Sequence, residues 1–242
     1  MSGEIRSLTG LRGVAATLVM VDHYTALDFS YRFPGNLLPH MYVAVDIFMI
    51  LSGFVLAMVY EKRFAGGNVW AATALFLKHR VARLYPLFLV MTLVCFVLCR
   101  EGWLTFLHPD VTFGGLAANL AGIQTWIWPW SSLDGPAWSI SAEWAANLLF
   151  PLLMPLVLLG PALLAVATVL VALVVLVGSA VLFGSLFDVP AAGVVNVISG
   201  PQALGRCVPE FVFGMALWRL RSRAGWASVF AGTWVQVALL VG

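Results

Sequence analysis

Long apolar stretches follow one another along this chain, and short polar segments separate them. An apolar run of about 18 residues or more can cross a bilayer as a helix. The pattern therefore predicts an all-α fold, a polytopic bundle of transmembrane helices with about 7–8 hydrophobic segments. We expect apolar segments at residues 10–27, 41–60, 84–100, 112–130, 136–159, 161–187, 203–220 and 226–242.

The composition agrees with this pattern. Hydrophobic residues make up 62% of the 242 residues, and charged residues only 10%. A soluble globular domain carries about 25% charged residues, so this chain cannot cover itself with a water-facing surface. We therefore expect an integral membrane protein surrounded by the lipid bilayer. The net charge of +2 is too small to indicate binding to nucleic acid.

Lysine and arginine gather between the second and third expected spans, at residues 61–83. Positive residues in short loops favour the cytoplasmic side, so this loop and the N-terminus are predicted to lie there. The same rule places Arg219, Arg221 and Arg223 in the cytoplasm. The number of spans agrees with both placements only if residues 112–130 do not cross. We therefore predict a re-entrant segment at these residues.

Two ionisable residues, Arg12 and His23, lie in or beside the first apolar segment. Such residues are costly in a membrane helix and indicate a function by default. Eleven residues at about 100° each bring both positions onto one helix face, about 16 Å apart along the axis. They can therefore contact the two ends of one long ligand. A neutral imidazole can take a proton from a hydroxyl at neutral pH, so we predict that His23 acts as a general base.

Four short motifs occur in order along the chain, and the first is the pair Arg12-x10-His23. The other three are VDIFMILSGF at 45–54, RVARLYP at 80–86 and PAWSISAEW at 136–144. In this order and spacing they resemble the acyltransferase 3 family of integral membrane O-acyltransferases. The segment Arg206–Gly214 is similar to a later helix of that family, with the pattern Arg/Glu-Phe-x-x-Gly. Each motif is weak alone, and together they are specific.

The resemblance implies a single transmembrane acyltransferase domain over residues 1–242. Members of the family move an acyl group, with acetyl as the first expectation, from cytoplasmic acyl-CoA to a hydroxyl of a surface polysaccharide or another carbohydrate. The expected partners are thus acyl-CoA as donor substrate, a carbohydrate acceptor and the bilayer, with no bound cofactor and no metal. The resemblance also implies a multi-pass protein of the bacterial inner membrane with a cytoplasmic N-terminus.

The sequence departs from the family pattern in two places. Phe48-Met49 stands where the family has two phenylalanines. The family has about ten spans, whereas this sequence stops in an apolar run at Gly242. We therefore expect a chain from which C-terminal spans are missing.

The resemblance implies catalytic roles for His23, Glu143 and Arg12. Glu143, or Asp46 in its place, would be the carboxylate that supports the imidazole, as the acid does in a triad. Donor and substrate contacts are expected from nine side chains: Arg80, Arg83, Tyr85, Asp46, Trp138, Ser139, Ser141, Arg206 and Glu210.

Structural roles compete with functional roles at several of these positions. Arg80 and Arg83 are three residues apart on a helix face and could bind the phosphates of the donor, or they could serve only the orientation in the membrane. Glu143 could form an ion pair with Arg206 instead of supporting the imidazole. Ser52-Gly53 is expected to allow close helix packing rather than to supply a nucleophile.

Two other functions remain open on the sequence alone. Buried ionisable residues also form the proton relays and substrate paths of transporters and permeases. Inverted repeats would favour a transporter, and we detect none in the sequence. The apolar end of the chain is also typical of a non-catalytic, truncated remnant.

Overall fold

The computed structural model describes residues 6–26, 43–103, 111–126, 132–187 and 200–223. All regular secondary structure in these ranges is helical, as the sequence predicts. The elements are α1 (Arg6–Ala26), α2 (Val43–Ala65), α3 (Val69–Arg100), α4 (Phe113–Leu120), η2 (Gly135–Ala137), α5 (Trp138–Leu153), η3 (Met154–Leu159), α6 (Ala162–Phe187) and α8 (Gly200–Arg223).

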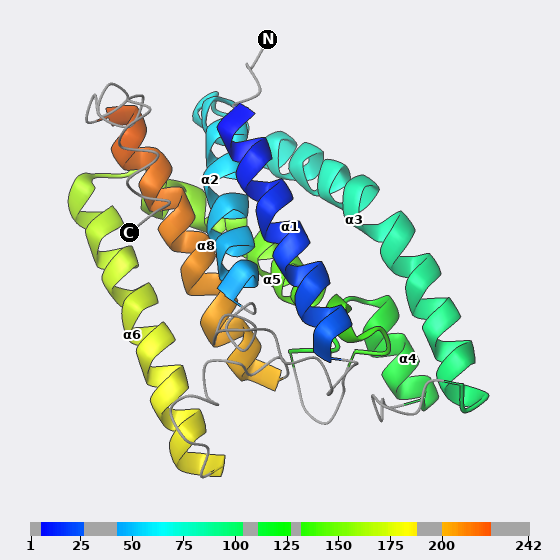
Figure 1. The fold of residues 1–242 in the computed structure, drawn as a ribbon. Helices are drawn as coiled ribbons and strands as arrows, with labels where there is room; N and C mark the ends of the chain where they lie inside the picture. The colour runs from blue at the N-terminus through cyan, green and yellow to red at the C-terminus, as the bar shows by residue number, and fades with distance from the viewer. Residues whose placement is uncertain (1–5, 27–42, 104–110, 127–131, 188–199, 224–242) are drawn as a thin grey trace.

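The long helices run alternately up and down (Figure 1). α1, α3 and α6 begin at the end of the bundle that carries the turn at 65–69, and α2, α5 and α8 run back towards it. A hydrogen bond links two helices there, since Trp218 Nε1 of α8 donates to Glu61 Oε2 of α2 at 2.8 Å. We name this the basic end of the bundle, because the lysines and arginines of 62–63 and 219–223 lie there.

Four helices are long and apolar enough to cross a membrane: Val43–Ala65, Val69–Arg100, Gly135–Leu159 and Ala162–Phe183. The most apolar of them, in α6, buries only 6% of its apolar window inside the protein. A helix that is apolar all round and exposed suits contact with lipid. The described residues thus have the architecture of an integral membrane protein. The sequence predicted about 7–8 hydrophobic segments, and the last of them, residues 226–242, lies outside the described ranges.

One predicted helix begins much earlier than expected. α3 starts at Val69, where the Asn68 side chain caps it, and continues to Arg100 without a break. The expectation that this helix begins at residue 84, with Pro86 in its first turn, is wrong because Pro86 lies inside the helix. The basic residues that suggested a loop instead belong to the amphipathic first half of α3, which buries one face and exposes the other.

α2 and α8 pack with their backbones in direct contact. A Cβ added at Gly53 would lie 2.0 Å from the Phe211 carbonyl oxygen, and one at Gly214 would lie 1.9 Å from the Ile50 carbonyl oxygen. Small residues allow helices in a membrane to approach this closely. The contact confirms the expected packing role of Gly53.

A cluster of aromatic rings joins four of the helices. Phe150 of α5 is fully buried and stacks on Phe76 of α3, with ring centroids 4.6 Å apart. Edge contacts link the same ring to Phe64 of α2 at 5.7 Å and to Phe211 of α8 at 6.0 Å. The cluster therefore fixes α5 relative to α2, α3 and α8.

The α5 helix ends at the basic end in η3, a single π-helical turn that contains Pro155. The last carbonyl groups of a helix lack hydrogen-bond donors within the helix. Arg219 of α8 is the donor here, and its guanidinium binds the carbonyls of Val157 at 2.7 Å, Leu158 at 3.3 Å and Gly160 at 3.0 Å. One guanidinium thereby ties the ends of two helices together.

The segment at 112–126 folds back against α5. α4 has eight residues, a length of about 12 Å that is too short to cross the apolar core of a bilayer. The Ser141 hydroxyl of α5 donates to the Gly122 carbonyl at 2.7 Å and holds the segment in place. This geometry agrees with the predicted re-entrant segment. Residues 127–131 of that segment lie outside the ranges that the structure describes.

Candidate functional site

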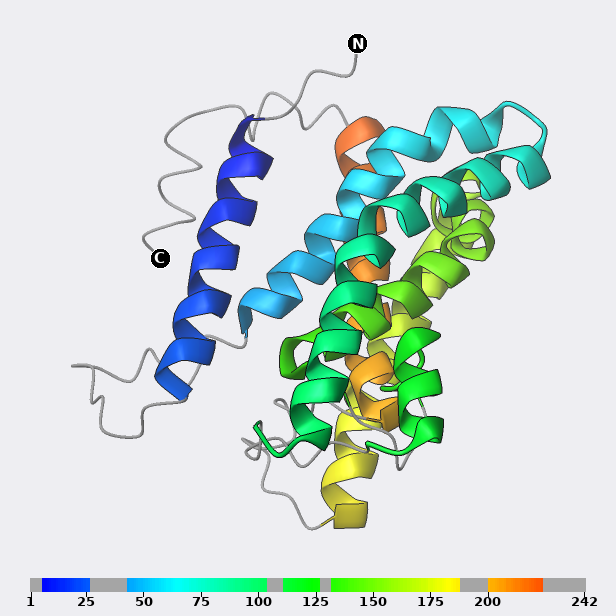
Figure 2. The ribbon, with the colours of Figure 1, turned by 90° about the vertical axis from the view of Figure 1, so that its right-hand side faces the viewer.

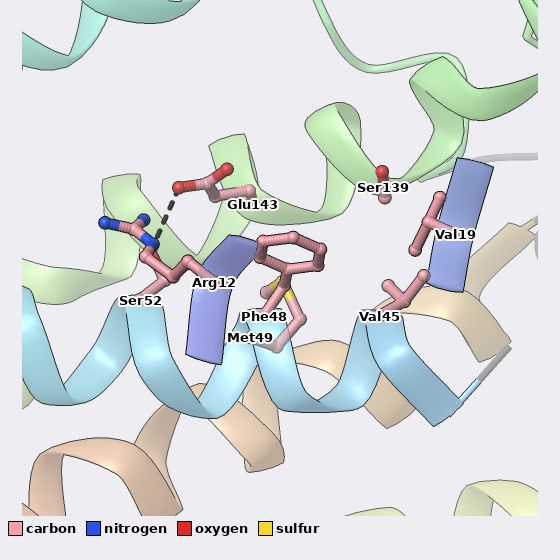
Figure 3. A pocket seen from close by; sticks show the side chains of 8 residues that line it. All are labelled: Arg12, Val19, Val45, Phe48, Met49, Ser52, Ser139 and Glu143. Atoms are coloured by element: carbon pink, nitrogen blue, oxygen red, sulfur yellow. Dashed lines mark hydrogen bonds between the residues drawn. The ribbon is translucent and has the colours of Figure 1, made fainter. Parts of the chain in front are cut away.

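A pocket of about 160 Å³ lies between α1, α2 and α5. α1 contacts α2 along one side of the bundle, and the other helices lie on the opposite side of α2 (Figure 2). Arg12, Ser52 and Glu143 meet at one end of the pocket, which is polar (Figure 3). The rest of the lining is mostly apolar, and consists of Val19, Val45, Phe48, Met49 and Ser139.

Glu143 holds the polar end of the pocket together. Its Oε1 accepts a hydrogen bond from the Ser52 hydroxyl at 3.0 Å and a charged one from Arg80 of α3. The Arg80 side chain is only 6% exposed, and a charge buried this deeply requires an opposite charge beside it. The three side chains therefore connect α2, α3 and α5 beside the pocket.

Arg206 of α8 pairs with Asp46 of α2. Arg206 Nε donates to Asp46 Oδ1 at 2.7 Å, and Glu210 Oε1 lies 3.8 Å from the same nitrogen. The guanidinium also lies over the Trp138 ring, 6.0 Å from its centroid. Four of the predicted substrate contacts thus form one cluster near the starts of α2, α5 and α8. The alternative that Glu143 pairs with Arg206 is wrong, because each of the two has a different partner.

α1 carries both residues of the first motif. Arg12 lines the polar end of the pocket, and Val19, seven residues later, lines the opposite end (Figure 3). At about 100° per residue, position 23 lies on the same face of α1 and about one turn beyond Val19. The His23 side chain lies outside the described part of the chain, so its contacts stay predictions.

Arg80 and Arg83 differ in their surroundings although both belong to α3. Arg80 is buried against Glu143, whereas Arg83 is exposed. Three residues correspond to about 300° of rotation, or 60° between the two side chains, so the helix turns one inwards and leaves the other outside. Arg83 is the more accessible of the two for a ligand from the surroundings, and a role in donor binding stays a prediction for both.

Tyr85, Ser139 and Ser141 have different neighbours. The Tyr85 hydroxyl donates to the Leu120 carbonyl at 3.1 Å, and the fully buried Ser141 side chain donates to the Gly122 carbonyl. The Ser139 hydroxyl donates to the Pro136 carbonyl at 3.0 Å and lines the pocket. Of these three predicted substrate contacts, Ser139 is therefore the one placed to meet a ligand there.

Four residues of α2 that line the pocket lie outside the site predicted from the sequence. They are Val45, Phe48, Met49 and Ser52. Their spacing, i, i+3, i+4 and i+7, puts them on one helix face, and this signal was present in the sequence. The hydroxyl of Ser52 contributes more than packing, because it binds the carboxylate of Glu143.

The pocket offers one cation, one carboxylate and two hydroxyls beside an apolar wall. Such a lining can bind a polar group at its charged end and an apolar group along the rest. Within the ranges that the structure describes, no three His, Cys, Asp or Glu side chains are grouped as metal ligands.

The long apolar helices define an integral membrane protein, and a partly polar pocket lies between three of the helices. The chain belongs to the family described as Acyltransferase domain, which matches residues 5–241. It is 33% identical over 162 residues to Acyltransferase MdmB of Streptomyces mycarofaciens, a match that covers 64% of this chain and 40% of that protein.

A second relative is Protein 2 in picA locus of Rhizobium radiobacter, which is 35% identical over 158 residues. This match covers 59% of the chain and 78% of the relative. The chain thus spans less than half the length of Acyltransferase MdmB and most of the length of the second relative. No solved structure matches the chain.

Proposed function

We propose that this chain is a membrane O-acyltransferase that moves an acyl group, with acetyl as the first candidate, from acyl-CoA to a hydroxyl of a surface polysaccharide or another carbohydrate. One observation carries the proposal: residues from three of the sequence motifs line one pocket, and a residue of the remaining motif binds one of them. Arg12, Ser52 and Glu143 come from the first, second and fourth motifs, and Arg80 of the third binds Glu143. Family membership and the name of Acyltransferase MdmB support the type of reaction.

The donor would approach from the basic end of the bundle. Arg12 lies near the start of α1 at that end and lines the pocket, and Arg83 is exposed on α3. Guanidinium groups suit the phosphates of coenzyme A. The separation of about 16 Å between positions 12 and 23 is comparable to the length of a phosphopantetheine arm. A donor held at Arg12 could therefore present its thioester near His23.

The transfer would exchange one bond for another at the acyl carbon. The acceptor hydroxyl oxygen attacks the thioester carbonyl carbon, and the carbon–sulfur bond breaks as the ester forms. His23, as general base, takes the hydroxyl proton and returns it to the leaving sulfur, so that coenzyme A departs as the free thiol. The apolar wall of the pocket would exclude water, which otherwise competes with the acceptor.

Glu143 fits the role of a positioning residue. In Figure 3 it lies at the Arg12 end of the pocket, whereas Val19, one turn before position 23, lies at the other end beside Ser139. Its Oε1 is already bonded to Ser52 and Arg80. We propose that Glu143 fixes the polar end for donor binding, and direct support of the His23 imidazole remains the alternative role.

The proposed orientation places the basic end in the cytoplasm, following the rule for lysine and arginine in short loops. The N-terminal end of α1 lies at the same end of the bundle. Acyl-CoA would then reach the pocket from the cytoplasm of a bacterium, through the inner membrane. The acceptor would reach it from the other end, where Trp138 and Asp46 lie.

Radiolabelled acetyl-CoA tests this function in membranes that contain the chain. We expect label in an acceptor and release of free coenzyme A, with a raised KM for acetyl-CoA in Arg12→Gln. Arg100→Gln is the matched control, because Arg100 is an exposed arginine at the far end of α3. Absence of any transfer or thiol release above membranes without the chain would rule the function out.

A further inference from the structure

We propose that the helical hairpin at the basic end of the bundle binds the headgroups of anionic phospholipids through Lys62, Arg63 and Lys78. The hairpin consists of residues 59–83, the end of α2 and the first half of α3, and we name it the surface hairpin. The inference concerns a partner of the protein in the membrane and does not depend on the proposed acyl transfer.

The surface hairpin projects sideways from the bundle. In Figures 1 and 2, the end of α2 and the start of α3 run out at the basic end, and α3 then bends and continues along the bundle. Gly67, with a φ of 98°, allows the tight turn between the two helices. Pro86 lies inside α3, and a proline removes one helical hydrogen bond and kinks the helix. The hairpin can therefore lie along the membrane surface while the rest of α3 crosses the membrane.

Positive charges on the surface hairpin are not balanced by nearby acidic residues. Lys62, Arg63 and Lys78 are exposed, and the ion pairs within the described parts of the chain involve other arginines. The sequence has no Asp or Glu from residue 62 to residue 100. Glu61, just before this range, is bonded to α8 instead. Anionic headgroups would supply the negative charge at the level where these helices enter the membrane.

Exposed apolar side chains lie next to these cations. Val59 is 51% exposed and precedes Arg63 by about one turn of α2, and Val81 is 40% exposed and follows Lys78 by about one turn of α3. Trp70, in the first turn of α3, is 87% exposed, and tryptophan favours the level of the headgroups. A phospholipid combines an anionic headgroup with apolar chains, whereas a soluble phosphate has no apolar chains. The surface therefore favours a lipid over a soluble anion.

The inner side of the surface hairpin is fixed to the bundle. Phe64 and Phe76 contact the Phe150 ring of α5, with centroids 5.7 Å and 4.6 Å apart. Arg80, in the same half of α3, binds Glu143 beside the pocket. A phospholipid on the outer side would therefore stabilise the half of α3 that carries Arg80.

Native mass spectrometry of the whole chain in detergent tests the inference, because it resolves the binding of single lipid molecules. Dioleoyl phosphatidylglycerol and dioleoyl phosphatidylcholine share the same chains and differ in the charge of the headgroup. The wild type should bind phosphatidylglycerol about tenfold more tightly or better, since each Lys or Arg near an anionic surface contributes about fivefold. The triple variant Lys62→Gln, Arg63→Gln, Lys78→Gln should lose this preference, and Lys78→Gln alone should lower it by about fivefold.

Arg100→Gln is the matched control for Lys78→Gln, because Arg100 is exposed at the far end of the same helix. It should keep the preference, and so should a triple variant that retains the charges, Lys62→Arg, Arg63→Lys, Lys78→Arg. Equal binding of both lipids by the wild type, or an unchanged preference in the glutamine triple variant, would overturn the proposal. Displacement of phosphatidylglycerol by excess glycerol phosphate would assign the cations to soluble phosphates and would overturn it as well.

Discussion

Three deeply buried arginines each connect different helices. Arg80, Arg206 and Arg219 are 5%, 5% and 8% exposed, and they bind Glu143, Asp46 and the carbonyls at the end of η3, respectively. A guanidinium has five donors in a planar fork and stays charged in an apolar interior. At the scale of single residues, all three side chains therefore hold helices together, and Arg80 and Arg206 also bind the carboxylates of Glu143 and Asp46.

Replacing Arg80 by alanine should destabilise the protein. The change leaves the carboxylate of Glu143, whose side chain is 21% exposed, without its ionic partner. Loss of one partner from a fully buried pair costs about 3–5 kcal/mol, so we expect a smaller loss of stability here. The midpoint of thermal unfolding in detergent should fall clearly. Arg83→Ala, on the exposed side of the same helix, should leave the midpoint near that of the wild type. Equal midpoints for the two variants would contradict the structural role of the pair.

His23→Ala should abolish acyl transfer while the protein still inserts into the membrane. Loss of a general base lowers the rate by about 10²- to 10⁴-fold. The measurement is transfer of radiolabelled acetyl from acetyl-CoA, normalised to the amount of the protein in the membrane. Activity within about threefold of the wild type lies outside that range and would remove His23 from the mechanism.

At the scale of helices, backbone contact between α2 and α8 forms the centre of the bundle. Gly53→Ala should separate these helices, because the new Cβ would lie 2.0 Å from the Phe211 carbonyl oxygen. We expect a loss of at least about 3 kcal/mol, at the upper end for overpacked cores, and a broad profile in size-exclusion chromatography. Gly178→Ala on α6 is the control, since a Cβ there meets nothing within 4 Å. Two equally well-behaved proteins would show that the close contact is not required.

The sequence predicted the positions of the helices better than it predicted which side chains of neighbouring helices form pairs. Runs of apolar residues located α5 with its break at Gly160, and α6, because lipid accepts only long apolar helices. The start of α3 was missed, since basic residues on one face of a helix resemble a loop when the chain is read linearly. The pairing of Glu143 with Arg80 rather than Arg206 depends on which helices are neighbours, and local patterns carry no such information.

In the candidate site, too, the sequence predicted some residues and missed others. Arg12, Ser139 and Glu143 were predicted from motifs and line one pocket. The apolar residues that shape the pocket were missed, because in a membrane protein an apolar side chain can face lipid, another helix or a ligand equally well. Only the packing of α1 on α2 distinguishes Phe48 from any other apolar residue.

At the scale of the whole molecule, both ends of the 101–134 connection should lie on the same side of the membrane. The chain has three cysteines, and single cysteines would be placed in a variant without them. Cysteines at positions 101 and 134 should react with an impermeant maleimide from outside intact cells, and one at position 66 should react only after permeabilisation. Labelling of 101 and 134 from opposite sides would mean that the segment with α4 crosses the membrane.

The clamp that Arg219 forms on the end of η3 has a consequence for biogenesis. The carbonyls of Val157 and Gly160 leave the ribosome about 60 residues before the guanidinium that binds them. During synthesis, these groups must bind water or the insertion machinery until α8 arrives. A nascent chain halted before Arg219 should therefore be cleaved by protease near Gly160, and a chain halted after α8 has emerged should resist. Equal resistance of the two intermediates would show that the end of η3 matures without α8.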